Sequence, residues 1–573
     1  MLQLPSIYRH YEQSPLECVY KALRNNDLAD CVLMAARVLR QSNNFIEFEH
    51  QEKSATESLK NGIDGKEAFC QGNYQMALVK YNMALMRAPP KSEAMRLSYY
   101  SRAELSLKTK QFQACVKDVE TCLALDCPDS MVMKLREMKE DASRFIWIEQ
   151  LAHVQVSSPF TEEFFTLKGA RNPNIPCATT DVEVIMESGQ PKVVAARDIP
   201  VGTLVAVETA FVGATHIMNH VTACHYCNKM DLNLMPCEGC CFAMFCDKRC
   251  KERAMQDGHI YECKIIELIL DDVKLPVKAV LKIRQLCSSW DEFISAANEL
   301  GVDRMENSSI AEIFGNHKFS LLNSHYDTHF LYGALFNRCL YMANIIYYLD
   351  KHTSFLPDYP KEKCAATHAV CRVLMHLALY CNPVQLQHFT SVCTESRTTL
   401  HNHPNKGYFP FLGNLANSCL PNSYVAGLRN SAALVTIAPV KKGAELTFSY
   451  IGHWLEVVPV ERSTRAKKML IHYRTVCQDC VICGGRADDY IFLNPHLSDA
   501  KVKAYKKFIT YINSKRNLPL NIKSDYKETC NILLALSDEP CSKEYVRGFV
   551  TFVQCIMNFV QSKYPNVIMT RYD

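Results

Sequence analysis

The segment 224–263 constrains the fold of this chain most strongly, because it is dense in side chains that bind metal ions. Its cysteines and one histidine form four pairs at short spacings: Cys224 and Cys227, Cys237 and Cys240, Cys246 and Cys250, and His259 and Cys263. Two ligands three or four residues apart can converge on one ion from a tight turn or from one face of a helical turn. Eight ligands are enough for two closed tetrahedral Zn²⁺ sites, which would be structural rather than catalytic.

The spacing leaves the assignment of ligands to ions open. The four pairs could share the two ions sequentially or crosswise. Cys241 directly follows Cys240 and is an alternative ligand, but Gly239 supplies the residue that a turn ending at Cys240 needs. Free thiols in a cysteine-rich loop are the other alternative, and the regular spacing argues against them.

The composition is that of a large globular protein. With 573 residues, of which 48% are hydrophobic and 22% charged, the chain is long enough for several domains with sizeable cores. No uninterrupted run of about 18 apolar residues predicts a membrane span, and the first residues do not form a secretion signal. The 28 cysteines therefore indicate a reducing compartment, the cytoplasm or the nucleus. A net charge of +4 without a basic arm gives no reason to expect direct binding of nucleic acid.

Residues 59–128 contain a helical repeat of the tetratricopeptide (TPR) type. Small and aromatic residues and a final proline recur in two copies: Gly65, Gly72, Tyr74, Ala77, Tyr81, Ala84, Leu85 and Pro89, then Ala103, Phe112, Cys115, Val119, Cys122, Leu123 and Pro128. Helical patterns over 16–40 and 130–145 are expected to cap the array, giving a helical domain over residues 1–152. Lys66 and Ser101 stand where chaperone-binding repeats carry asparagine, so we expect a structural or other peptide-binding role instead.

The rest of the chain alternates between strand and helix patterns. Strand patterns run over 181–211 and return over 423–437 and 445–450, whereas 264–400 is mostly helical by periodicity. The expected fold class is α+β with several domains. Their expected order is a helical repeat domain (1–152), a first β-rich part (153–223), the metal-binding finger (224–263), a helical insertion (264–406), a second β-rich part (407–475), a short cysteine segment (476–485) and a small helical C-terminal domain (486–573).

Five short motifs in this order resemble those of one enzyme family. They are Ala195–Gly202, Gly407–Pro410, Ala416–Asn422, Gly443–Tyr450 and the cysteines at 477, 480 and 483. Together they resemble the SET domain of protein-lysine methyltransferases, and the finger between the two parts resembles a MYND zinc finger. With the repeats, the chain is similar to the TPR-bearing subgroup of the SET and MYND domain family. In MYND fingers the first and third ligand pairs hold one ion, and the second and fourth hold the other.

The resemblance implies an activity and a set of site residues. The activity is methyl transfer from S-adenosylmethionine to a lysine of a protein substrate. Tyr450 would border the methyl-transfer channel as the catalytic residue, and the cofactor would contact Gly189, Ala416, Asn417, Tyr450 and Tyr473. A third zinc ion, for a total of three, would be held by Cys419, Cys477, Cys480 and Cys483.

The sequence departs from the family pattern at the cofactor site. The family motif Asn-His-Ser-Cys begins here with Ala416 and Asn417, so the side-chain amide of its first residue is missing. Where many relatives have Gly-x-Gly, Pro191 stands two residues after Gly189, and a proline has no N–H to donate to the cofactor. A neighbouring amide, Asn414 or Asn417, could compensate.

Two functions fit these observations. The first is a protein-lysine N-methyltransferase that uses S-adenosylmethionine. The second is an adaptor with the same fold and a degraded cofactor site, which recruits protein partners through its finger and its repeats. MYND fingers dock short proline-containing peptides, so partners with such peptides suit either function.

Overall fold

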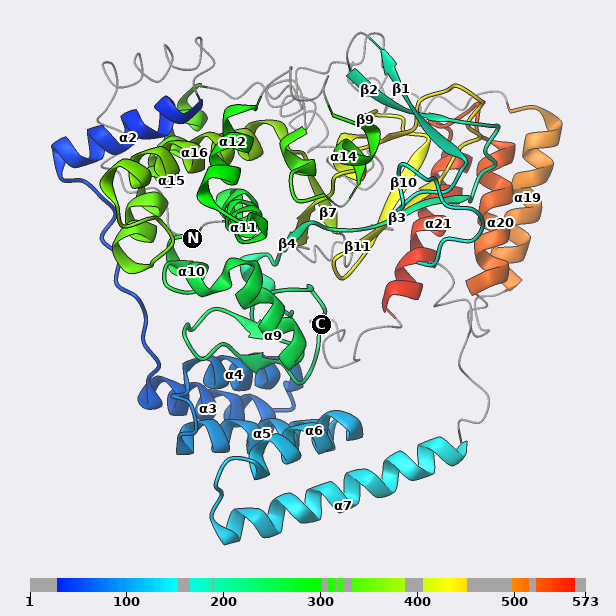
Figure 1. Ribbon diagram of the computed structural model, residues 1–573. Coiled ribbons are helices and arrows are strands. Elements are labelled where there is room, and N and C mark those ends of the chain that lie inside the picture. The colour runs from blue at the N-terminus through cyan, green and yellow to red at the C-terminus, as the bar shows by residue number, and fades with distance from the viewer. Residues whose placement is uncertain are drawn as a thin grey trace.

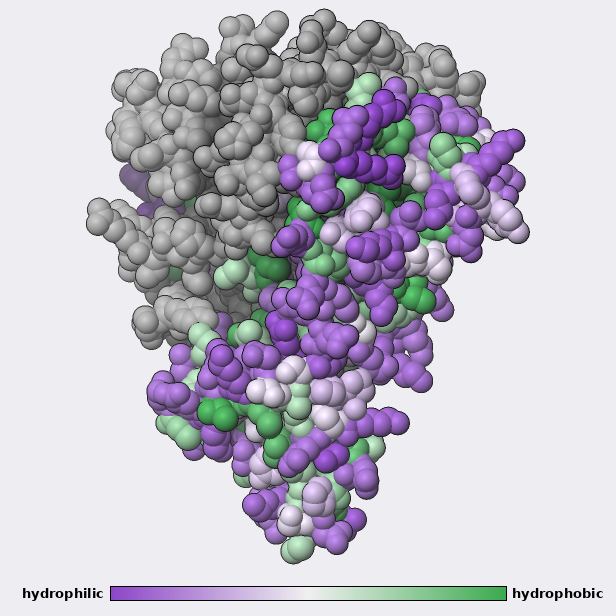
Figure 2. Space-filling model, turned by 90° about the vertical axis from the view of Figure 1, so that its left-hand side faces the viewer, coloured by the Kyte–Doolittle hydropathy of each residue, from purple (hydrophilic) through white to green (hydrophobic). Residues whose placement is uncertain are grey.

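A computed structural model describes most of the chain as a mixture of helices and small sheets (Figure 1). The described residues are 28–152, 165–187, 190–269, 271–300, 308–315, 317–323, 332–386, 405–450, 497–514 and 522–561. Gly189, Tyr473, Cys477, Cys480 and Cys483 fall outside these ranges, and the predictions for them stay predictions. None of the described helices combines the length and the apolar character that a membrane span requires. Much of the described surface on the face shown in Figure 2 is hydrophilic, with apolar side chains in scattered patches.

The predicted repeats form a helical array. Its helices are α3 (Ala55–Cys70), α4 (Tyr74–Arg87), α5 (Glu93–Lys108), α6 (Phe112–Leu123) and the longer α7 (Asp129–Ala152). The side chains of Ser54, Asn73 and Ser92 cap the first three helices by accepting a backbone N–H of the first turn. Gly65 allows α3 and α4 to approach closely, because a Cβ there would lie 2.6 Å from the ring of Tyr81.

The helix that precedes the array does not cap it. α2 (Leu28–Ser42) packs on α15 (Tyr332–His352) and α16 (Pro360–Tyr380), which lie in the stretch 264–406 that we predict to be a helical insertion. Most of its buried residues recur every three or four positions. All of them lie in one hydrophobic cluster with those of α16: Ala29, Cys31, Val32, Ala35 and Leu39. The prediction that residues 16–40 cap the repeats is therefore wrong for the described part of that stretch, 28–40. An amphipathic pattern indicates which face of a helix is buried, but not against which partner.

Strands from both sides of the finger pair with one another. β3 (Leu204–Thr209) precedes the finger and is antiparallel to β11 (Ser431–Thr436), which also pairs with β10 (Ser423–Leu428). β4 (Val212–Ala214) pairs with β8 (Asn405–Tyr408), whose other neighbour is β7 (Pro383–Leu386). Two further pairs are the antiparallel ribbon of β1 (Val182–Glu187) and β2 (Gln190–Ala195) and the parallel pair of β9 (Ala416–Asn417) and β12 (Thr447–Phe448). The finger thus lies in the chain between strands that share sheets.

The remaining elements surround these strands. The finger contains β5 (Met235–Pro236), β6 (Met244–Phe245), α9 (Lys248–Ala254), η3 (Met255–His259) and α10 (Ile260–Glu262). The insertion adds α11 (Asp271–Leu286), α12 (Trp290–Asn298) and α14 (Ile310–Phe314) to α15 and α16. Single helical turns lie at η2 (Ile217–Asn219), η4 (Ile266–Leu268), η5 (Ser320–Asn323) and η6 (Leu412–Asn414). The C-terminal helices α19 (Asp499–Ser514), α20 (Ile522–Ala535) and α21 (Lys543–Gln561) share a hydrophobic cluster with β10 and β11.

A buried polar network joins the repeats to the finger, which lies against them in Figure 1. Arg102 of α5 is fully buried and donates two hydrogen bonds to the carboxylate of Asp118, at 2.7 and 2.8 Å. The same guanidinium group donates to Asn82 Oδ1 at 2.6 Å and to the backbone carbonyl of Leu234 at 2.8 Å. Asn82 in turn donates to the carbonyl of Val221, just before the finger. Because a buried charge needs its partners, the network fixes the orientation of the repeats on the finger.

Replacing Arg102 with Leu should lower the free energy of unfolding by about 3–5 kcal/mol, because Asp118 would stay buried without its partner. The control is Lys66→Ala, which removes an exposed ion pair with Glu104 and should cost less than about 1 kcal/mol. Urea denaturation followed by circular dichroism measures both changes. Equal costs for the two variants would contradict the importance of the buried network.

Candidate functional site

The first ligand group joins the first and third cysteine pairs of the finger. Cys224 and Cys227 lie in the loop after η2, Cys246 follows β6, and Cys250 lies in α9. Their four Sγ atoms all lie within 4.8 Å of one another. The side chain of Asp247 begins α9 by accepting the backbone N–H of Cys250 at 2.6 Å, so the cap sets where the helix carrying this thiol starts.

The second group joins the second and fourth pairs. Cys237, Cys240, His259 and Cys263 are buried, and their ligand atoms also lie within 4.8 Å of one another. The structure therefore groups the four pairs crosswise rather than sequentially. Cys241 does not take part, because its Sγ faces a backbone carbonyl in the segment before α3 at 3.5 Å. Of the two adjacent cysteines, Cys240 is the candidate ligand.

Both groups fit Zn²⁺ in geometry and chemistry. Zn–S bonds of about 2.3 Å at tetrahedral angles separate the sulfur atoms by about 3.8 Å. Three separations between Sγ atoms are close to this value: 3.5 Å for Cys246 and Cys250, 3.7 Å for Cys227 and Cys246, and 3.7 Å for Cys237 and Cys263. Four thiolates, as in the first group, and three thiolates with one imidazole, as in the second, are both ligand sets of structural zinc sites.

A buried carboxylate fixes the orientation of His259. Glu262 Oε2 lies 2.8 Å from His259 Nδ1, and Nε2 of the same ring faces Cys240 Sγ at 4.0 Å. In the neutral imidazole, a proton on Nδ1 that is donated to a carboxylate leaves Nε2 without a proton, and this tautomer can bind a metal ion through Nε2. Glu262 was not among the residues predicted from the sequence. Its position three residues after His259, one helical turn away, is the signal that could have identified it.

The predicted cofactor residues meet at the parallel strand pair. Ala416 and Asn417 form β9, which lies beside β12. Tyr450 follows β12 and is buried. Its backbone N–H donates to Asn417 Oδ1 at 3.2 Å, and its phenol donates to the carbonyl of Leu415. The structure therefore brings Ala416, Asn417 and Tyr450 together, whereas Gly189 and Tyr473 lie outside the described residues.

One amide at this strand pair has an unused donor. Asn417 Nδ2 is buried and has no hydrogen-bond partner within the described part of the chain. Asn414 differs, because its Nδ2 donates to the carbonyl of Pro410 at 2.7 Å. An unpaired buried donor costs about 1–3 kcal/mol, so Asn417 Nδ2 is the better candidate for a ligand contact.

The β1–β2 ribbon approaches the same strands. The carbonyl of Val193 accepts the N–H of Leu446, and the N–H of Ala195 donates to the carbonyl of Ala444, each at 2.9 Å. β2 therefore runs beside the segment that leads into β12. Pro191 lies near the start of β2, and it offers no backbone N–H to the strand or to a ligand.

A buried glutamate that the sequence analysis did not identify holds the segment before β9. Glu208 of β3 accepts the backbone N–H groups of Phe411 and Leu412 at 2.9 and 2.8 Å. Burial raises the pKa of Glu208 to about 8, although the two N–H groups lower it. An acidic residue within the otherwise apolar strand pattern of 204–209 is the signal that could have drawn attention to it.

Comparison with known proteins supports the resemblance. No protein-family model matches the chain. The chain is similar to protein-lysine N-methyltransferase SMYD4 of Pongo abelii, with 22% identity over 536 residues that cover 73% of this chain and 66% of that protein. SMYD4 of Homo sapiens is 23% identical over 545 residues, with the same two shares. The chain thus spans about two thirds of the length of these curated relatives.

A shorter match concerns a different protein. The DnaJ homolog subfamily C member 7 homolog of Schizosaccharomyces pombe is 33% identical over 99 residues, which cover 17% of this chain and 20% of that protein.

The long matches confirm the resemblance to the SET and MYND family, and the relatives they name are lysine methyltransferases.

Replacing Cys240 with Ala should release one Zn²⁺ per chain, because its thiol faces the second ligand group. Cys241→Ala is the control and should release none. Native mass spectrometry counts the ions, and in the unaltered protein we expect three if Cys419 shares one with Cys477, Cys480 and Cys483. Loss of an ion from the Cys241 variant alone would reverse the assignment.

Glu208→Gln should flatten the pH dependence of stability. In the unfolded chain the carboxyl group ionises near its usual pKa of 4.5, whereas in the fold its pKa is about 8. Between these values the unfolded state binds fewer protons, so the stability of the unaltered protein falls as pH rises, by up to about 1.4 kcal/mol per pH unit. The glutamine does not titrate. Denaturation at pH 5, 6.5 and 8 should show that the free energy of unfolding of the variant rises relative to that of the unaltered protein as pH rises. If both free energies changed with pH in parallel, the raised pKa would be contradicted.

Proposed function

We propose that this chain is a protein-lysine N-methyltransferase that uses S-adenosylmethionine to methylate a lysine of a protein substrate. The observation that carries the proposal is the buried, unpartnered Nδ2 of Asn417 beside the buried Tyr450. A donor left unpaired at this place fits a bound ligand with a hydrogen-bond acceptor. The names of the similar proteins from Pongo abelii and Homo sapiens support the same reaction class.

The chain's own residues can orient and desolvate the reactants. When bound, S-adenosylmethionine supplies an electrophilic methyl group on a sulfonium. Asn417 is held by the backbone N–H of Tyr450, so its Nδ2 presents an N–H in a fixed direction. The phenol of Tyr450 donates its proton to the Leu415 carbonyl, which fixes the orientation of the phenol group. Beside buried side chains such as Tyr450, desolvation would favour a neutral lysine amine, the form that can attack a methyl carbon.

The second candidate function is an adaptor that does not bind the cofactor. Ala416 favours it, because the side chain cannot supply the amide that the family motif places there. Pro191 also favours it, because it offers no N–H toward the cofactor region. The loss of one buried hydrogen bond weakens binding by about 1–3 kcal/mol, which is roughly tenfold to a hundredfold.

Several further features belong to the same proposal. Two zinc ions would be held in the finger and a third by Cys419 with Cys477, Cys480 and Cys483. Protein substrates or partners, among them proline-containing peptides, would dock on the MYND-like finger, and the repeats would offer a further peptide-binding surface. The abundance of cysteines suits the cytoplasm or the nucleus.

Isothermal calorimetry with S-adenosylmethionine should separate enzyme from adaptor. We expect saturable binding to the purified chain and a loss of about tenfold or more in Asn417→Asp, which keeps an acceptor for the N–H of Tyr450 but removes the donor. Asn414→Asp is the control, because the Asn414 amide is already paired within the protein. Ala416→Asn should tighten binding by roughly tenfold.

The outcomes decide between the two functions. No heat from the unaltered chain and from Ala416→Asn would reject the enzyme in favour of the adaptor. Binding by the unaltered chain that does not change in Asn417→Asp or in Ala416→Asn would keep the cofactor but reject both assigned contacts.

A further inference from the structure

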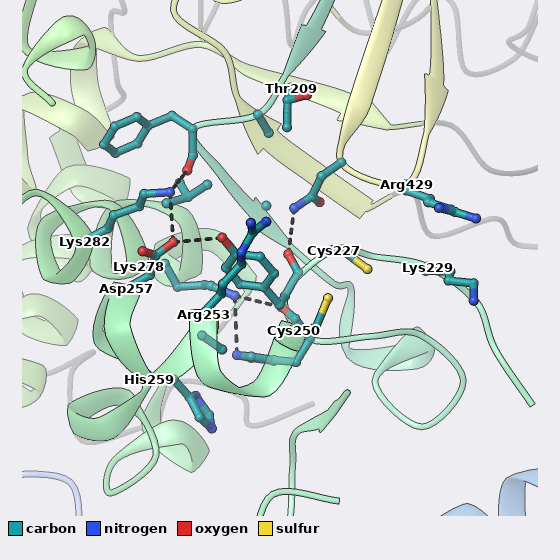
Figure 3. A pocket seen from close by; sticks show the side chains of 18 of the residues that line it. Thr209, Cys227, Lys229, Cys250, Arg253, Asp257, His259, Lys278, Lys282 and Arg429 are labelled. Atoms are coloured by element: carbon teal, nitrogen blue, oxygen red, sulfur yellow. Dashed lines mark hydrogen bonds and ion pairs between the residues drawn. The ribbon is translucent and has the colours of Figure 1, made fainter. Parts of the chain in front are cut away.

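A cleft that includes none of the candidate cofactor residues lies between the finger and the tip of the β10–β11 hairpin. Its volume is about 370 Å³, and its walls come from α9, η3, α11 and the segment joining β3 to β4. Figure 3 shows Arg253 and Lys282 on one side of the cleft and Arg429 with Lys229 on the other. A recess of this volume suits a single side chain or small group.

The lining of the cleft is rich in positive charge. Six cationic side chains contribute to it: Lys229, Arg249, Arg253, Lys278, Lys282 and Arg429. Its three carboxylates are engaged within the protein. Asp257 pairs with Lys282 at 2.9 Å, Asp247 caps α9, and Glu262 bonds to two buried imidazoles. Within the described residues, none of these carboxylates therefore pairs with an arginine of the cleft.

The arginines differ from the neighbouring lysines in their partners. Both lysines of α9 have carboxylate partners: Lys248 with Glu252 at 3.7 Å and Lys251 with Glu238 at 2.8 Å. Arg249 and Arg253 lie one helical turn apart on the same helix and are exposed. The guanidinium groups of Arg249, Arg253 and Arg429 make no hydrogen bond or ion pair within the described ranges. Three guanidinium groups at one recess are thus free to bind an anion.

The position of Arg429 is set by an unfavourable backbone conformation. It occupies the two-residue turn between β10 and β11 with φ of 58°, in the left-handed region that residues other than glycine rarely adopt. The next residue, Asn430, fixes the turn to the finger, because its Nδ2 donates to the carbonyl of Tyr226 at 2.6 Å. The backbone carbonyl of Asn430 accepts the N–H of Ala210 at 2.8 Å. Such conformations persist where contacts enforce them, often at binding sites.

We propose that this cleft binds a phosphorylated side chain of a partner protein. A guanidinium group pairs with phosphate through two parallel hydrogen bonds, and a phosphate carries close to two negative charges, enough to engage more than one arginine. A single carboxylate carries one charge and has only two oxygens. Duplex DNA presents its phosphates along a wide cylinder rather than on a projecting side chain, so a recess of about 370 Å³ favours the side chain. The proposal does not depend on methyl transfer.

Offsetting the charge of a zinc site is an alternative role for the arginines, and an experiment can distinguish it from phosphate binding. Cys227 and Cys250 also line the cleft, and a Zn²⁺ ion with four thiolates has a net charge of −2. If the arginines served only to offset that charge, their removal would weaken zinc retention, and the cleft would have no preference for phosphate.

The test measures the binding of labelled peptides to the zinc-loaded full chain by fluorescence anisotropy. The probes are a pool with a central phosphoserine and random neutral flanks, the same pool with serine, and a short DNA duplex. The phosphoserine pool should bind at least about tenfold more tightly than the serine pool. Arg249→Gln with Arg253→Gln should lose this difference, whereas Lys248→Gln with Lys251→Gln, which removes the same charge from the same helix, should keep it.

A second variant guards against a general loss of structure. Arg429→Gly relieves the positive φ, so its melting temperature should not fall, and it should still weaken phosphoserine binding several-fold. Three results would overturn the proposal: no preference for the phosphorylated pool, equal losses in the arginine and lysine variants, or tighter binding of the duplex than of the phosphopeptides. Reduced zinc content in the arginine variant together with full phosphoserine binding by Arg429→Gly would assign the charge to the thiolates instead.

Discussion

Eight side chains that converge in two crosswise groups hold together a segment with very short strands and helices. β5 and β6 have two residues each, and α9 has seven, so thiolates and one imidazole take the place of a large hydrophobic core in the finger. The repeats and the helices after the finger both contact this segment. Lys53 donates to the carbonyl of Cys237 at 2.6 Å from the side of the repeats, and Lys278 donates to that of His225 at 3.0 Å from the insertion. The free energy of metal binding would therefore stabilise more than the finger itself.

The sequence predicts the local parts of this arrangement well. Each ligand pair spans at most five residues, so its spacing already indicates that the two side chains can reach one ion. The grouping of Cys224 with Cys246, rather than with Cys237, depends on the path of the chain between the pairs and follows from the structure. The sequence leaves that choice open. The repeats are predictable for the same reason, since each helix packs on its nearest neighbours in the chain.

Contacts between distant segments are harder to predict. The amphipathic face of α2 is visible in the sequence, but its partners α15 and α16 follow about 300 residues later, and the repeats are the wrong partner. Glu208 is a similar case. The two backbone N–H groups that it accepts, those of residues 411 and 412, lie about 200 residues later in the chain and are known only from the structure. At the proposed cofactor site the sequence identifies Ala416 as a departure from the family motif. The structure adds that Asn417, not Asn414, retains an unused donor.

The position of α2 has a consequence for synthesis on the ribosome. Its apolar face is made first, whereas the helices that cover it come much later, as the hydrogen bond between Tyr348 and the carbonyl of Ile46 across 302 residues illustrates. At about 5–20 residues per second, the ribosome needs roughly 15–60 s to make the intervening chain. During that time the repeats and the finger are already available to fold. The earliest described helix is thus among the last to be buried, and nascent chains carry an uncovered apolar face for most of their synthesis.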